Sequence, residues 1–254
     1  MISIVIPYYS NNHGLAVLLT LLQQQTMLPH TIIVLDSSPS ENGKEIVDRY
    51  SVNMNIKYVK HRGTIYEAWN AGLSLQKKGS IAFLNDDVLV PLTFIEYLHK
   101  VSQAHKAYSY VPDTPSIEHR EKTVIGNHFK WIQHPHLKIK NTSWLTGFCF
   151  ILTRSAINTI GTFDTNVKIW FGDFDYQERI LDFAKRTNTQ GIIRIQGLYV
   201  YHYGTSSYKL YQRKVRKQIN KDRKYFNQKY NAIPNYSDIV EKRIINETKN
   251  LSLL

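Results

Sequence analysis

The fold is decided by the stretch Ser80-Ile81-Ala82-Phe83-Leu84-Asn85-Asp86-Asp87-Val88-Leu89-Val90-Pro91. Its apolar run, Ile81 to Leu84, has the length and composition of a strand buried on both faces. Acidic residues follow at once, and they are costly at the end of a buried strand unless solvent, a metal or a ligand receives them. Ligands of open α/β sheets bind at the carboxyl ends of the strands. The stretch therefore predicts either a ligand site or an Asx-rich turn that merely ends the strand.

Strands and helices alternate regularly around this stretch. Apolar runs predict strands and amphipathic segments predict helices, in the order Ile2–Ile6, Leu15–Leu22, Thr31–Leu35, Glu41–Tyr50, Ile56–Val59 and Thr64–Lys77. This alternation predicts an α/β fold with a mainly parallel, twisted sheet flanked by helices. The fingerprint Gly-x-Gly-x-x-Gly and the Gly-Lys-Ser/Thr phosphate loop are both absent, which disfavours ordinary NAD-dependent and P-loop enzymes.

The chain after Pro91 is less regular. We expect helices at Phe94–Ala104, Arg154–Ile160 and Tyr176–Lys185. We expect strands at Ala107–Val111, Trp144–Leu152 and Ile192–Tyr201. The irregular segment Asp113–Ile139 is long enough to predict an active-site flap or an acceptor loop. The tail from Tyr208 to Tyr230 predicts a basic, aromatic helix.

Composition narrows the class of protein. The single cysteine, Cys149, excludes an intrachain disulfide and a cysteine-rich zinc site, and its apolar neighbours predict a buried core residue. The chain has neither the basic start of a signal peptide nor the roughly 20 apolar residues that span a bilayer, so we expect a cytoplasmic protein, peripheral at a membrane surface at most. The net charge of +12 favours a polyanionic partner: nucleic acid, an anionic membrane surface or a phosphate-bearing ligand.

Four segments, in order, resemble the GT-A-fold (Rossmann-like) nucleotide-sugar glycosyltransferases, particularly the large inverting family numbered two. They are Ser3–Tyr9, Val34–Ser38, Leu84–Asp87 in the place of the Asp-x-Asp motif, and Gly147–Asp175 with its Thr162-Phe163-Asp164 turn. The resemblance covers residues 1–204. It implies a nucleotide-sugar-binding half at 1–111 and an acceptor-binding half at 112–204, followed by a basic helical extension at 205–254.

The resemblance also implies which residues bind the donor. Pro7 and Tyr8 would flank the base, Asp36 would accept a hydrogen bond from a pyrimidine imide, and Asn85 or Asp86 would hold the ribose. Arg62 would meet phosphate, although a solvated loop charge is as good a reading. Asp87 would bind Mn²⁺ or Mg²⁺, with His202 as a second ligand unless it is a surface loop histidine.

Two departures from the family pattern affect the chemistry. Asn85 replaces the first Asp of Asp-x-Asp, which moves the expected metal contact to Asp87, and Gly172 replaces the Glu of the Glu-Asp motif. Asp173 is then the residue that matches the general base, in a partly apolar setting that suits this role. Asp173 is favoured over Asp175, which suits helix capping or acceptor binding, although a first-turn acid is natural at either position.

The predicted function is inverting, metal-dependent transfer of a sugar from a UDP- or dTDP-sugar to a hydroxyl of a glycan or lipid-linked acceptor. The charge of +12 motivates one alternative, glycosylation of modified nucleic acid. The departures at Asn85 and Gly172 motivate another, a non-catalytic module that binds nucleotide or glycan. For the basic tail we expect an anionic membrane surface, nucleic acid or no partner at all.

Overall fold

The computed structural model of the protein describes residues 1–113, 137–202 and 212–230. Most of the expected flap, the first residues of the expected tail helix and the end of the chain lie outside the described residues. The elements are β1 Ile2–Tyr8, α1 Asn12–Gln23, β2 Ile32–Asp36, α2 Asn42–Tyr50, β3 Ile56–Lys60, α3 Ile65–Leu75, β4 Ser80–Leu84, β5 Val88–Leu89, α4 Phe94–Ala104, β6 Ser109–Asp113, β7 Lys138–Thr142, β8 Cys149–Leu152, α6 Arg154–Ile160, α7 Gly172–Thr187, β9 Ile192–Tyr199, β10 Tyr201–His202 and α8 Gln212–Lys229.

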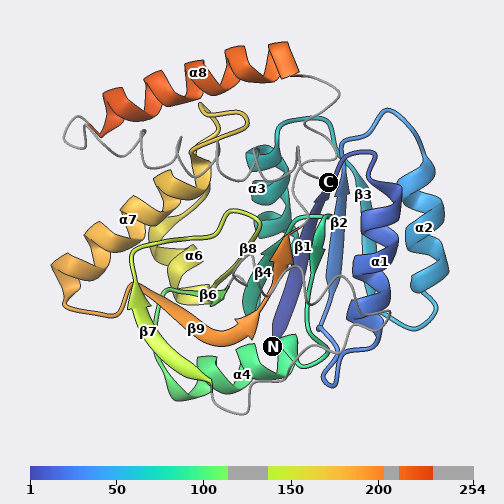
Figure 1. Ribbon diagram of the computed structural model, residues 1–254, viewed down its shortest axis with the longest axis horizontal. Coiled ribbons are helices and arrows are strands. Elements are labelled where there is room, and N and C mark those ends of the chain that lie inside the picture. Colours follow the sequence, from blue (N-terminus) through green and yellow to red (C-terminus); the bar gives the residue numbers. More distant parts are fainter. Residues whose placement is uncertain (114–136, 203–211, 231–254) are drawn as a thin grey trace, which may run out of the picture.

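One sheet of eight strands runs through the molecule in the order β3-β2-β1-β4-β8-β6-β9-β7 (Figure 1). The pairs β1–β2, β2–β3, β1–β4 and β6–β9 are parallel, whereas β8 and β7 run against their neighbours. A second, two-stranded sheet joins β10 to β5. The predicted α/β fold with a mainly parallel, helix-flanked sheet is confirmed.

The central strands are apolar on both faces because helices cover both. In β1, the alternate residues Ile4 and Ile6 join the apolar cluster formed with α1, α2 and α4. Val5, which points the other way, joins the cluster formed with α3, α6, α7 and α8. The continuous runs of the sequence are therefore those of a doubly covered sheet.

The second cluster centres on Trp69 of α3, whose ring meets Phe83, Phe150 and Phe163 edge-on or tilted at 4.9–5.6 Å. The neighbouring side chain of Asn70 donates to the carbonyl of Phe163 and accepts from its N–H, at 3.0 and 2.8 Å. Helix α3 thus holds the start of the connection from α6 to α7. This connection leads into the first turn of α7, which carries the expected base Asp173.

Three predicted elements differ most from the observed ones, and strands β5 and β7 were not predicted. The strand expected from Trp144 begins only at Cys149, because a turn precedes it in which the Cys149 N–H donates to the carbonyl of Thr146. Helix α7 begins at Gly172, one turn earlier than predicted, and so includes both acidic candidates in its first turn. The last strand divides into β9 and β10, which belong to different sheets. Cys149 is buried, as predicted.

Candidate active site

The turn Asn85–Asp87 follows β4 and lies against the loop after β1. The carboxylate of Asp86 is buried and accepts from the Tyr9 N–H and the Asn11 side chain, both at 3.4 Å. Gly14 in α1 permits this approach, because a Cβ there would lie 2.2 Å from the Asp86 carbonyl oxygen. Burial, reinforced by the charge of Asp87, raises the pKa of Asp86 to about 8.

Asp87 and His202 meet although they are far apart in the sequence. Strand β10 pairs with β5 so that His202 lies opposite Val88, and the His202 Nε2 is 3.1 Å from an Asp87 carboxylate oxygen. The ring of Phe148 stacks on His202 with centroids 4.4 Å apart. Both polar side chains are partly exposed, at 14% for Asp87 and 20% for His202.

This donor set fits Mn²⁺ or Mg²⁺, with a carboxylate and an imidazole close together on two partly exposed side chains. The Asn85 Oδ1 is buried and has no hydrogen-bond partner among the described residues, so a further oxygen acceptor is available in the same turn. Within the described part of the chain, no three His, Cys, Asp or Glu residues gather into a metal cluster. A cation here would therefore take most of its ligands from water or from a bound ligand.

Asp173 lies in the first turn of α7 and is partly exposed. Its carboxylate packs against Gly147, where a Cβ would lie only 2.3 Å from the Asp173 Oδ2. The next residue, Phe148, accepts the Asn85 N–H at 2.9 Å through its carbonyl and stacks on His202 through its ring. The segment Gly147–Phe148 therefore contacts the expected base on one side and the expected metal turn on the other.

Asp175 has a different environment. It is buried and ion-paired with Arg179 at 2.9 Å and Lys229 at 2.6 Å, and it accepts from the Tyr230 hydroxyl at 2.7 Å. These partners hold the carboxylate in the contact between α7 and α8. Asp175 is therefore enclosed by its protein partners, whereas Asp173 is partly exposed.

The residues expected to contact the base are enclosed. Asp36 is fully buried and binds the Ser38 N–H at 2.7 Å, the Tyr58 hydroxyl at 2.5 Å and Lys60 at 3.2 Å. Tyr8 is also buried, and its hydroxyl binds the Asn12 side chain. Contact of either side chain with a base requires these internal bonds to open, and their donor roles stay predictions.

The other expected donor contacts lie nearer the surface. Pro7 is partly exposed and Arg62 is exposed in the loop after β3. Tyr9 is the exposed aromatic residue of the loop after β1, although the sequence pattern favoured its neighbours. The sequence did not predict that Asn11, Lys60 and Gly147 contact the carboxylates of Asp86, Asp36 and Asp173, respectively. Nothing in the local pattern of these three residues indicates a contact with a distant carboxylate.

The described part of the basic tail, α8, packs against the connection into α7. Tyr225 and Lys229 bind Asp164 at 2.9 and 2.6 Å, and Phe226 stacks on Phe171 at 5.2 Å. In Figure 1 the helix lies across one end of the molecule beside α7. Asp222, the one acidic residue of α8, is buried in this contact, and an isolated acid in a run of cations was the available sequence signal.

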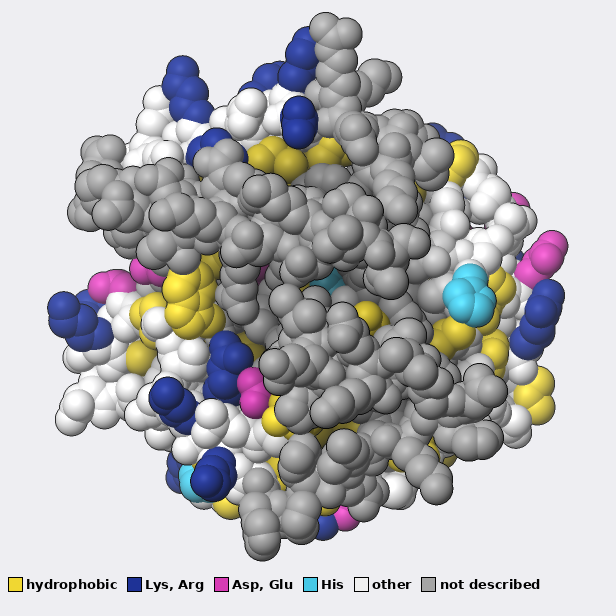
Figure 2. All heavy atoms as spheres, viewed as in Figure 1, with side chains coloured by type: hydrophobic (Ala, Val, Ile, Leu, Met, Phe, Trp, Pro, Cys, Tyr) yellow, Lys and Arg dark blue, Asp and Glu magenta, His cyan; other side chains and the backbone are white. Residues whose placement is uncertain are grey.

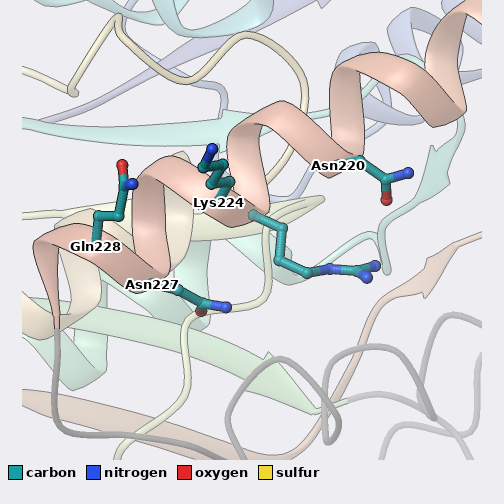
Figure 3. Close-up of a pocket in the computed structure, with 5 residues that line it drawn as sticks. Asn220, Lys224, Asn227 and Gln228 are labelled. Atoms are coloured by element: carbon teal, nitrogen blue, oxygen red, sulfur yellow. The ribbon is translucent and has the colours of Figure 1, made fainter.

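The other face of α8 is basic. Lys and Arg side chains project from this end of the molecule in Figure 2, and the exposed cations on this face of the helix are Arg216, Lys217, Lys221 and Lys224. An open hollow of about 540 Å³ is lined by α8 side chains (Figure 3), namely Asn220, Arg223, Lys224, Asn227 and Gln228. None of the described helices is long and apolar enough to cross a bilayer.

The Asp164 contact predicts a pH dependence of stability. Burial opposes its ionisation, but hydrogen bonds from Lys229, Asn166 and Tyr225 outweigh burial and lower the pKa from 3.8 to about 2. Because the folded-state pKa is depressed, the stabilisation is present above about pH 4 and is lost as the pH falls toward 2. Between about pH 5 and pH 2 we expect the wild type to lose about 1–2 kcal/mol more than Asp164→Asn, as measured by urea unfolding. Equal losses in the two proteins would contradict this assignment.

The chain is similar in sequence and in fold to known glycosyltransferases. The chain is 36% identical over 91 residues to a chondroitin synthase of Escherichia coli, a match that covers 34% of this chain and 13% of that protein. A crystal structure of S. aureus TarS 1–349 in complex with UDP-GlcNAc superposes with a TM-score of 0.60 at 16% identity, over 81% of this chain and 59% of that one. The mannosyltransferase PcManGT of Pyrobaculum calidifontis, in complex with GDP-Man and Mn²⁺, gives 0.59 at 14% identity, over 81% and 57%.

The chain thus spans less than two thirds of each of these proteins, and the two structural likenesses show the GT-A fold alone. The family model described as Glycosyl transferase family 2 matches residues 3–161, which is more than half of the sequence. The chain belongs to glycosyltransferase family 2.

Proposed function

We propose that the protein is an inverting, metal-dependent glycosyltransferase that moves a sugar from a UDP- or dTDP-sugar to a hydroxyl of a glycan or lipid-linked acceptor. Residues 1–111 would bind the donor and residues 112–204 the acceptor, with 205–254 as a basic extension. The observation that carries the proposal is the segment Gly147–Phe148, which contacts Asp173 on one side and the Asn85–Asp87 turn on the other.

The residues of the chain would divide the reaction between them. Asp173 would take the proton of the acceptor hydroxyl while its oxygen attacks the anomeric carbon, and the bond from that carbon to the diphosphate would break on the opposite face. Asp87 and His202 would hold Mn²⁺ or Mg²⁺, which when bound supplies positive charge for the departing diphosphate. Asn85 or Asp86 would hold the ribose.

Two observations support the donor class. One solved neighbour carries UDP-GlcNAc and another carries GDP-Man with Mn²⁺, as their descriptions state. The buried Asp36, next to Tyr8, is the group proposed to meet a pyrimidine base once its internal partners release it. A carboxylate also accepts from the N–H groups of guanine, so a panel of UDP-, dTDP- and GDP-sugars distinguishes these bases.

The exposed cations of α8 support an anionic partner, either a membrane surface or a nucleic acid. Cosedimentation with phosphatidylserine vesicles and a mobility-shift assay with DNA, each at two salt concentrations, distinguish these two partners.

The function is tested by release of nucleoside diphosphate. We expect one or more donors in a panel of UDP-, dTDP- and GDP-sugars to be turned over with a glycan acceptor mixture, and to need Mn²⁺ or Mg²⁺ for the full rate. EDTA should abolish release, and added Mn²⁺ should restore it. Measurable nucleotide binding without turnover of any donor would instead favour a non-catalytic binding module.

A further inference from the structure

Helix α8 supplies a buried carboxylate to the turn that precedes Asp173. The Asp222 Oδ2 accepts the backbone N–H groups of Lys168, Ile169 and Trp170 at 3.1, 2.8 and 3.1 Å. Its Oδ1 accepts from the Gln218 side chain at 2.7 Å, and Asp222 itself is only 1% exposed. The Asp222 carboxylate thus binds the turn Lys168–Trp170 through the backbone N–H groups of the turn.

The same turn is held from the core side. The Tyr66 hydroxyl of α3 donates to the Ile169 carbonyl at 3.1 Å. Helix α8 accepts the N–H groups of the turn, and helix α3 donates to one of its carbonyls. Two separate helices therefore hold the path of the chain into α7.

The turn leads directly into a strained residue. Phe171 adopts a left-handed conformation with φ of 74°, which a non-glycine residue keeps only when its surroundings enforce it. Its ring is buried and stacks on Phe226 of α8 at 5.2 Å, and its carbonyl accepts the Asp175 N–H at 2.8 Å. Asp173 lies two residues further on, so the direction of its side chain depends on this strained link.

The hydrogen bonds between the Asp222 carboxylate and the backbone of Lys168–Trp170 are strengthened by the charge of the carboxylate. Hydrogen bonds to an ionised carboxylate are about twice as strong as neutral ones, and a buried carboxylate without donors would be costly. The buried Asp222 carboxylate therefore needs the N–H groups of Lys168–Trp170 as donors, and these N–H groups need the carboxylate as their acceptor. A general base that is misplaced by about 1 Å can lose about a hundredfold in rate.

We propose that Asp222 is a positioning residue for the base: through the turn Lys168–Trp170 and the left-handed Phe171, it sets the place of the Asp173 carboxylate. The inference rests on the proposed function, since it assigns to α8 a role in the rate of the transfer step and none in donor binding.

The test compares Asp222→Asn and Asp222→Ala with the wild type in the full chain. Asparagine keeps one acceptor oxygen at the same place but loses the charge, whereas alanine removes every acceptor. We expect kcat to fall about tenfold in Asp222→Asn and about a hundredfold in Asp222→Ala, while the affinity and stoichiometry of UDP binding with Mn²⁺ stay within twofold. The graded loss in kcat at constant donor affinity would separate positioning from a general loss of folded protein.

Tyr225→Phe is the matched control. It removes the hydroxyl by which α8 binds Asp164 and Asn166 but leaves the turn Lys168–Trp170 untouched, so kcat should not change. The inference is overturned by an unchanged kcat in folded Asp222→Asn, which decides the matter if the alanine variant does not fold. An equal fall in Tyr225→Phe overturns it too, since docking of the whole helix would then be responsible. A wild type that turns over no donor would instead refute the proposed function, and the positioning role with it.

Discussion

Asp173→Asn should abolish sugar transfer while leaving donor binding in place. The amide cannot take the acceptor proton, and removal of a general base costs about a hundredfold to ten-thousandfold in rate. The change conserves shape, so the packing against Gly147 and the first turn of α7 should persist. We expect kcat to fall at least a hundredfold, with the dissociation constant of UDP within twofold of wild type by calorimetry.

Two further variants decide the assignment. Asp182→Asn makes the same change on an exposed position of α7, where the carboxylate pairs with Arg186, and should leave the rate unchanged. Asp175→Asn should lower the free energy of unfolding, because the buried Asp175 carboxylate loses its ion pairs with Arg179 and Lys229. If Asp173→Asn retains transfer while a stably folded Asp175→Asn loses it, the base is Asp175.

Asp87→Ala should remove the response to the metal. Asp87 is the one carboxylate proposed to bind the cation, and metal stabilisation of a departing diphosphate amounts to several kcal/mol, or at least about a hundredfold in rate. We expect kcat/KM to fall by at least that factor. Mn²⁺ should no longer tighten UDP binding in a titration monitored by calorimetry or thermal shift. His202→Ala should have a smaller effect, since water can take the place of one imidazole.

The matched control for this prediction is Asp48→Asn on α2, where an exposed carboxylate pairs with Lys44. Its rate and its Mn²⁺ response should equal those of the wild type. A normal Mn²⁺ response in Asp87→Ala would show that the cation is held elsewhere and would remove Asp87 from the site.

The sequence was sufficient for the architecture because the fold depends on local patterns. Doubly covered strands require continuous apolar runs such as Ile81–Leu84, and this run lies within an observed strand. Boundaries that depend on side-chain contacts were less accessible. The turn before Cys149 is closed by hydrogen bonds with Thr146, and the early start of α7 at Gly172 brings that glycine against the ring of Tyr66 in α3.

The candidate site was partly predictable for the same reason. Asp87 comes shortly after a recognisable buried strand, and Asp173 lies at the start of a recognisable helix. Asp87 lies near His202, and Asp173 lies near Gly147, which agrees with the order of the motifs. The enclosure of Asp36 by Tyr58 and Lys60 could not be foreseen, because it depends on the register of β3 beside β2. The contact of Asp222 with three backbone N–H groups could not be foreseen either, since an acid isolated in a run of cations does not indicate its partner.

The close approach of Gly147–Phe148 also has a consequence for protein engineering. Because β8 lies antiparallel to β4 and its preceding segment touches both the metal turn and the base, one rigid segment sets the distance between the two halves of the proposed reaction. A chimera that exchanges the acceptor half after β6 would import a foreign segment here and alter that distance. Grafts that keep residues 145–152 with the donor half, and exchange only the chain beyond Leu152, preserve it.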